Sequence, residues 1–373
     1  MHTDGVLMIR GLWARIPLHP TDAPRPHPRL FPWVQALRAI AAAAVAFFHI
    51  ANDAVTAGRD PSGLIVSVSA LMPWTAGVDI FFVISGFVIV HASAKLFAQP
   101  GGSARFLRRR LTRIVPLYWV LRTLFLAMTL LQRSAIHGET GGPGYILASY
   151  LFIPFARPGG LPEPALGLGW TLNYEMFFYL VMTPFLLLPR LAAVAGSAAA
   201  LCLLVTIGQT VGFGFLPLRF WSDPIVLEFV LGMGLALAVS RGLSLPGWAR
   251  VAMIAIAVAW LHHQAGGPSL GRVVSFGLPG ALLVAAAVSN RRADHIGPTA
   301  GVLIRLGDAS YAMYLFHPFV MRGFTLLGAH IAMHTETSGI VYVATSLAVA
   351  QLCALAINAG FERKVTAILR RRA

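Results

Sequence analysis

The sequence predicts an all-α, polytopic membrane protein with about ten transmembrane helices and both termini in the cytoplasm. Of its 373 residues, 57% are hydrophobic and only 12% are charged, whereas a soluble domain carries about 25% charged residues. Ten stretches of the chain also reach the ~20 mostly apolar residues that a bilayer-spanning helix needs. Clusters of arginine and lysine separate these stretches and indicate their orientation.

The expected spans follow one another closely along the chain. They cover residues 33–56, 72–95, 114–132, 170–189, 191–210, 221–240, 248–265, 271–289, 303–327 and 339–361. The apolar segment Tyr145–Phe155 is too short to cross a bilayer, so we expect an interfacial or re-entrant helix on the outer side. No repeat is visible, and the sequence therefore predicts one membrane domain over residues 33–361.

Two polar segments flank this domain. Residues 1–32 are rich in proline and lack the compact apolar run of a signal peptide, so we expect a flexible cytoplasmic leader. Residues 362–373 form a basic cytoplasmic tail. Both cysteines, Cys202 and Cys353, lie inside apolar runs, where we expect them to fill space rather than form a disulfide or bind a metal. No metal site is expected.

The chain is strongly basic, with 29 lysines and arginines against 14 acidic residues and a net charge of +15. Such a charge can indicate nucleic-acid binding. With the N-terminus in the cytoplasm, however, most of the cations fall on cytoplasmic segments and helix ends, as the positive-inside rule requires. The net charge is therefore a consequence of topology, and we expect no nucleic-acid partner.

The first span carries one arginine and one histidine in an otherwise apolar stretch, LRAIAAAAVAFFHI. His49 follows Arg38 by eleven positions, so in a helix the two side chains return to within roughly 20° of one face, about 16 Å apart. Ionisable groups on one face of a membrane helix indicate a polar cavity inside a bundle. His49 is the sharpest candidate for a general base, although a hydrogen-bonded packing role is the alternative.

Five arginines stand at the cytoplasmic mouth of the third span, in and next to FLRRRLTRIVPLYWV. Arg110 and Arg113 are about one helical turn apart and can face the same point. The arginine fork suits phosphate oxygens. Membrane anchoring or binding of anionic lipid headgroups is the alternative, and it accounts better for Arg108 and Arg109 than for the pair that enters the helix.

Polar residues in three other spans complete the candidate site. Asp79 lies in the second span, in GVDIFFVISGFVIV, and Glu175 in WTLNYEMFFYL, deeper than Trp170. Glu175 could orient a histidine or bind a hydroxyl group. In LGDASYAMYLFHPFV, the spacing places Ser310, Tyr314 and His317 on one helix face. We expect Pro318, directly after His317, to interrupt the hydrogen bonds of that helix.

These segments together resemble the acyltransferase family 3 membrane proteins. The resemblance rests on five motifs in order: Arg38 and His49 with ten residues between them, then GVDIFFVISGF, the paired arginines before IVPLYW, WTLNYEMFFY and GDASYAMYLFHP. It covers about residues 33–361 and is strongest to the exopolysaccharide-production branch, which acetylates bacterial surface sugars. The leader, residues 1–32, has no counterpart in it.

The resemblance implies transfer of an acyl group, usually acetyl from acetyl-CoA, to a carbohydrate hydroxyl at the bacterial inner membrane. Acyl-CoA is then a donor substrate, and no bound cofactor is implied. The family's catalytic residues fall on His49 and Glu175, and its acyl-CoA-binding arginines on Arg38, Arg110 and Arg113. His49 would deprotonate the acceptor hydroxyl or accept the acyl group itself.

The expected partners are therefore acyl-CoA, a carbohydrate acceptor, free or lipid-linked, and membrane lipids. Because the arginines face the cytoplasm while Trp170 and Glu175 lie toward the outer side, we expect the acceptor outside and a meeting of both substrates near His49 and Glu175. Two other readings remain open from the sequence alone. One is a transporter or flippase of a lipid-linked saccharide, with the buried charges as a proton relay. The other is a non-catalytic partner in polysaccharide export.

Overall fold

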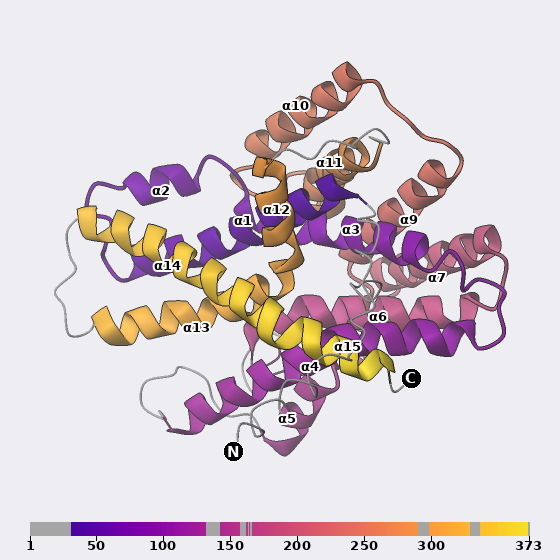
Figure 1. Cartoon of the computed structure of the whole chain (residues 1–373), viewed down its shortest axis with the longest axis horizontal. Helices are drawn as coiled ribbons and strands as arrows, with labels where there is room; N and C mark the ends of the chain where they lie inside the picture. Colours follow the sequence, from indigo (N-terminus) through magenta and orange to yellow (C-terminus); the bar gives the residue numbers. More distant parts are fainter. Residues whose placement is uncertain are drawn as a thin grey trace, which may run out of the picture. The chain divides into compact units, whose positions relative to one another are not determined.

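The computed structural model describes residues 31–131, 142–156, 162, 164, 166–289, 298–328 and 336–371. The chain divides into two units, Met1–Phe31 and Pro32–Ala373. The described residues lie almost entirely in the second unit, and within them all regular structure is helical (Figure 1). The expected leader lies outside the described residues except for its last two positions.

The helices follow the chain in a simple order. Their bounds are α1 (Pro32–Thr56), α2 (Leu64–Ser69), η1 (Trp74–Ala76), α3 (Gly77–Ala92), α4 (Gly102–Leu131), α5 (Pro143–Tyr150), η2 (Gly167–Gly169), α6 (Trp170–Phe185), α7 (Arg190–Thr210), α8 (Leu216–Trp221), η3 (Pro224–Val226), α9 (Leu227–Ser240), α10 (Gly247–His263), η4 (Val273–Gly277), α11 (Leu278–Val288), α12 (Pro298–Asp308), α13 (Ser310–Gly328), α14 (Glu336–Ile357), η5 (Asn358–Glu362) and α15 (Arg363–Arg371).

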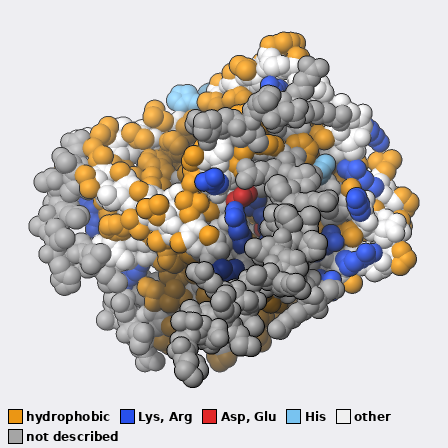
Figure 2. All heavy atoms as spheres, viewed as in Figure 1, with side chains coloured by type: hydrophobic (Ala, Val, Ile, Leu, Met, Phe, Trp, Pro, Cys, Tyr) orange, Lys and Arg blue, Asp and Glu red, His pale blue; other side chains and the backbone are white. Residues whose placement is uncertain are grey.

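The all-helical class predicted from the sequence is confirmed for the described residues, and the helices include candidates for membrane crossing. Five are long and apolar enough: Pro32–Thr56, Trp74–Ala92, Gly102–Leu130, Arg190–Thr210 and Gly339–Leu369. Two shorter apolar helices are Pro224–Ser240 and Val273–Val288. Apolar side chains cover much of the face that Figure 2 shows. The number of ten spans and the position of the termini stay predictions.

The expected span 303–327 differs from the structure, which divides this segment into α12 and α13 around Ala309. In Figure 1, α12 runs at a steep angle to α13. Just before this break α12 packs closely on α1: a Cβ atom on Gly307 would lie 1.9 Å from the carbonyl oxygen of Gln35. Pro318, by contrast, does not end α13, which continues through it to Gly328.

Two glycines bring α3 and α9 together backbone to backbone. A Cβ atom on Gly86 would lie 2.1 Å from the carbonyl oxygen of Phe229, and one on Gly232 would lie 2.0 Å from that of Val83. Small residues allow this approach, which is a common way for membrane helices to associate. The contact fixes α3 inside the bundle, so its polar residues face neighbouring helices.

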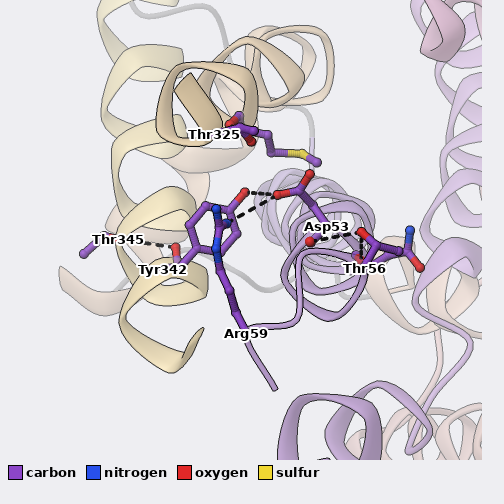
Figure 3. A network of polar contacts seen from close by, with 8 residues as sticks. Asp53, Thr56, Arg59, Thr325, Tyr342 and Thr345 are labelled. Atoms are coloured by element: carbon purple, nitrogen blue, oxygen red, sulfur yellow. Dashed lines mark hydrogen bonds and ion pairs between the residues drawn. The ribbon is translucent and has the colours of Figure 1, made fainter. Parts of the chain in front are cut away.

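A polar clamp, formed by Asp53, Arg59 and Tyr342, joins the end of α1 to α14 (Figure 3). The Tyr342 hydroxyl donates a hydrogen bond to the Asp53 carboxylate, and Arg59 lies 3.7 Å from the same carboxylate. The Arg59 guanidinium also stacks on the Tyr342 ring, 4.3 Å from its centroid. Because Arg59 is buried, these contacts replace the water that its charge loses, and they fix the end of α1 that follows His49.

We expect Tyr342→Phe to lower the free energy of unfolding by about 1.5 kcal/mol, because it removes a hydrogen bond to a charged group. Tyr342→Leu should cost more, since the ring under Arg59 is also lost. Thr345→Ala is the control, because this exposed hydroxyl bonds only to carbonyl groups of its own helix. Thermal unfolding of the detergent-purified protein measures the effect, and a Tyr342→Phe protein as stable as the control would contradict the clamp.

Candidate active site

A cavity inside the bundle is lined by residues of α1, α3, α4, α6 and α13 and has a volume of about 90 Å³. Six of the residues predicted from the sequence line it: Arg38, Arg110, Arg113, Glu175, Ser310 and Tyr314. These residues come from four helices that are far apart along the chain. The structure thus brings together most of the predicted site.

The cavity is elongated along α3. Its lining extends from Val78 to Ile89, and eleven residues of α-helix rise about 16 Å. Near one end, Tyr179 of α6 packs against Phe106 of α4, with ring centroids 6.1 Å apart, and Arg110 lies over that same Phe106 ring. The first residues of α6, beginning with Thr171, line the other end.

The first end of the cavity is cationic. Arg38, Arg110 and Arg113 all line it, and the Arg38 guanidinium donates to the side-chain oxygen of Gln35 at 3.3 Å. Glu175, Asp308 and Glu362 act electrostatically on Arg38 and partly offset this positive charge. Three guanidinium groups facing one space are suited to bind a ligand that carries several phosphate or carboxylate groups.

Glu175 is held in the middle of the cavity by two hydroxyl groups. Ser85 of α3 donates to its Oε1 atom at 3.3 Å, and Tyr179, one turn further along α6, donates to the same oxygen. The carboxylate therefore has a fixed orientation, with one oxygen engaged by the protein. Its position lies between the arginines at one end and Tyr314 at the other.

Tyr314 crosses the far end of the cavity from α13. Its hydroxyl donates to the Leu168 carbonyl at 3.2 Å and lies 3.0 Å from the Thr171 hydroxyl. The Tyr314 ring also contacts His317, with centroids 6.4 Å apart. Tyr314 therefore both lines the cavity and contacts His317.

His49 lies next to His317 and is not among the residues that line this cavity. The two imidazole rings are 5.2 Å apart between centroids and inclined by 39°. Arg38 and His49 do belong to one helix, α1, yet only Arg38 reaches the cavity. The sequence spacing predicted a shared helix face but gave no information on which helices pack against each of the two residues.

Asp79 takes no part in the cavity lining and instead forms a buried ion pair. Arg272, just before η4, donates to both of its carboxylate oxygens at 2.8 and 2.9 Å. The same guanidinium lies 5.8 Å from the Trp170 and Phe276 ring centroids. This pair ties the first turn of α3 to α6 and η4 beside the Tyr314 end of the cavity.

Several residues around the site were not predicted from the sequence. Ser85, Tyr179 and Tyr311 line the cavity, and Tyr311 also donates to the Ile114 carbonyl at 2.8 Å. Tyr179 was detectable, because it follows Glu175 by four residues on a helix. Arg272 and Glu362 lie at the boundaries of expected spans. A charged side chain needs no internal partner there, so nothing in the sequence identified them as residues near the site.

A helical bundle with a cationic internal cavity and a fixed carboxylate fits an enzyme that acts on an anionic substrate inside a membrane. The family model described as an acyltransferase domain, acyltransferase family 3, matches residues 31–359. The chain therefore belongs to this family, and the resemblance inferred from the sequence motifs is confirmed.

Two relatives stand out in the comparison with known proteins. Exopolysaccharide production protein ExoZ from Rhizobium meliloti (strain 1021) is 32% identical over 313 residues, which cover 80% of this chain and 94% of the relative. Acyltransferase MdmB from Streptomyces mycarofaciens is 30% identical over 357 residues, which cover 88% of each chain. No solved structure matches the chain.

Proposed function

We propose that this protein is an integral membrane O-acyltransferase that moves an acyl group from acyl-CoA, preferentially acetyl from acetyl-CoA, to a hydroxyl of a surface or exported carbohydrate. Membership of acyltransferase family 3 supports the transfer chemistry. A relative named for exopolysaccharide production supports a carbohydrate acceptor. The bacterial inner membrane is the proposed location, because acetyl-CoA is made in the cytoplasm and the cation distribution places the arginine end on that side.

The cavity is the observation that carries this proposal. Coenzyme A joins a polyphosphorylated nucleotide to a long, thin thioester arm. A cationic end and about 16 Å of largely apolar lining along α3 suit these two parts. In this arrangement Arg38, Arg110 and Arg113 hold the phosphates, while the thioester reaches past Glu175 toward Tyr314.

The acceptor approaches from the histidine side. His49 takes the proton of its hydroxyl group, the oxygen attacks the thioester carbonyl carbon, and the carbon–sulfur bond breaks to release the coenzyme A thiolate, which takes up the proton. In the second route, Nε2 of His49 attacks the thioester carbonyl carbon, and the carbon–sulfur bond breaks to release the coenzyme A thiolate. The acceptor oxygen then takes the acyl group from the ring, and its proton goes to the thiolate. Both routes need a path from the cavity to His49, which lies beside His317, the neighbour of the cavity residue Tyr314.

The arginine pair supplies the first test of the proposed donor. Arg110→Ala and Arg113→Ala should each weaken acetyl-CoA binding, and added salt should weaken wild-type binding, because charge-assisted contacts to phosphate are lost or screened. Arg108→Ala is the matched control, since Arg108 belongs to the same arginine run but is exposed and does not line the cavity. The affinity of each variant for acetyl-CoA is measured by calorimetry with the protein in nanodiscs. Equal losses of acetyl-CoA affinity in all three variants would show that the donor binds elsewhere.

The proposed role of His49 is tested by its removal. We expect His49→Ala to lower acetyl transfer by about 10²–10⁴-fold, the usual contribution of a general base, while acetyl-CoA binding is retained because His49 is outside the cavity lining. The assay uses labelled acetyl-CoA and the polysaccharide fraction of a host strain that lacks this protein. His263→Ala, at an exposed position, is the control. If acetyl transfer by His49→Ala is within threefold of that control, His49 has a packing role and is not the general base.

A further inference from the structure

His317 has a buried nitrogen that the site as described does not use. Its side chain lies fully inside the bundle on α13, and its Nδ1 atom is 3.1 Å from the Met313 carbonyl oxygen. In the described part of the chain, its Nε2 atom has no hydrogen-bond partner. A buried polar atom without a partner costs about 1–3 kcal/mol, so a structure that retains one at a functional site needs an explanation.

The hydrogen bonds of both histidines define which nitrogen carries the proton. A carbonyl oxygen can only accept, so the Nδ1 of His317 must donate and its Nε2 keeps a lone pair. The same reasoning applies to His49, whose Nδ1 lies 2.8 Å from the Val45 carbonyl oxygen. Each ring is thus held by the carbonyl one turn earlier in its own helix, and each has a basic Nε2.

These two basic rings are neighbours, 5.2 Å apart between centroids. Two lone pairs cannot bond to each other, but one added proton satisfies both, since an Nε2–H group on His49 is a donor and the Nε2 of His317 is an acceptor. In the resting state the two Nε2 atoms therefore form no hydrogen bond with each other, and protonation of His49 allows one to form.

We propose that His317 is the positioning partner of His49, and that its Nε2 accepts a hydrogen bond from the His49 imidazolium formed during transfer. The proposal rests on the proposed function. The acceptor O–H bond breaks, its proton moves to Nε2 of His49, and the oxygen forms the new ester bond as the carbon–sulfur bond breaks. The new Nε2–H group of His49 then turns from the ester oxygen toward the Nε2 of His317. His317 stabilises the cation at this stage, until the proton passes to the departing thiolate.

Two substitutions separate this role from simple packing. His317→Leu introduces an apolar side chain of comparable size and removes the acceptor atom, whereas His317→Gln keeps an acceptor atom. We expect His317→Leu to lower kcat by about 10²-fold with an unchanged KM for acetyl-CoA, because His317 does not line the cavity, and His317→Gln to recover part of the loss. With His49→Ala already present, His317→Leu should cause no further loss, because the two rings act as a unit.

A spectroscopic measurement tests the pair independently of activity. In nuclear magnetic resonance spectra of protein with isotope-labelled histidine, both residues should show the Nδ1–H form, and His317→Leu should change the pH at which the Nε2 resonance of His49 moves to its imidazolium position. An unchanged resonance, or additive losses in the double variant, would overturn the proposal. If the wild-type protein transfers no acetyl group, the proposed function fails, while the spectra still decide whether the two rings are coupled.

Discussion

Ionisable side chains inside an apolar helical bundle need a partner or a polar cavity, because a charge at the centre of a bilayer costs about 2.5–3.5 kcal/mol even on the most lenient scale. This constraint organises the structure. The partner of Asp79 is Arg272, which donates two hydrogen bonds to its carboxylate. The partners of Arg59 are Asp53 and Tyr342, the other residues of the clamp. Arg38 meets this constraint by facing a cavity that it shares with Glu175.

The close approach of α3 and α9 adds a second constraint. Glycines at positions 86 and 232 put the two backbones in contact, which leaves the opposite side of α3 to face α1, α6 and α13. Ser85, next to Gly86, then reaches Glu175 across that space. Ser85 is the polar member of an otherwise apolar α3 lining in this cavity.

Much of the site could be predicted from the sequence, since helical spacing shows which residues share a face. Arg110 with Arg113, and Ser310 with Tyr314, are such pairs, and all four line the cavity. Contacts between helices could not be predicted in the same way. The partner of Asp79 lies 193 residues away, and α13 places His317 beside His49 although no local pattern links them. The close approach of Gly307 to Gln35 of another helix is a further contact of this kind.

The arrangement has two compartments. We propose that acyl-CoA binds in the arginine-lined cavity and that the acceptor meets the histidine pair, next to Tyr314. The most direct test uses membrane vesicles of defined orientation, with acetyl-CoA supplied only at the cytoplasmic face and the carbohydrate acceptor confined to one face at a time. The account predicts acetylation of an acceptor held on the opposite, extracytoplasmic face. Transfer only to an acceptor on the same face as acetyl-CoA would contradict it.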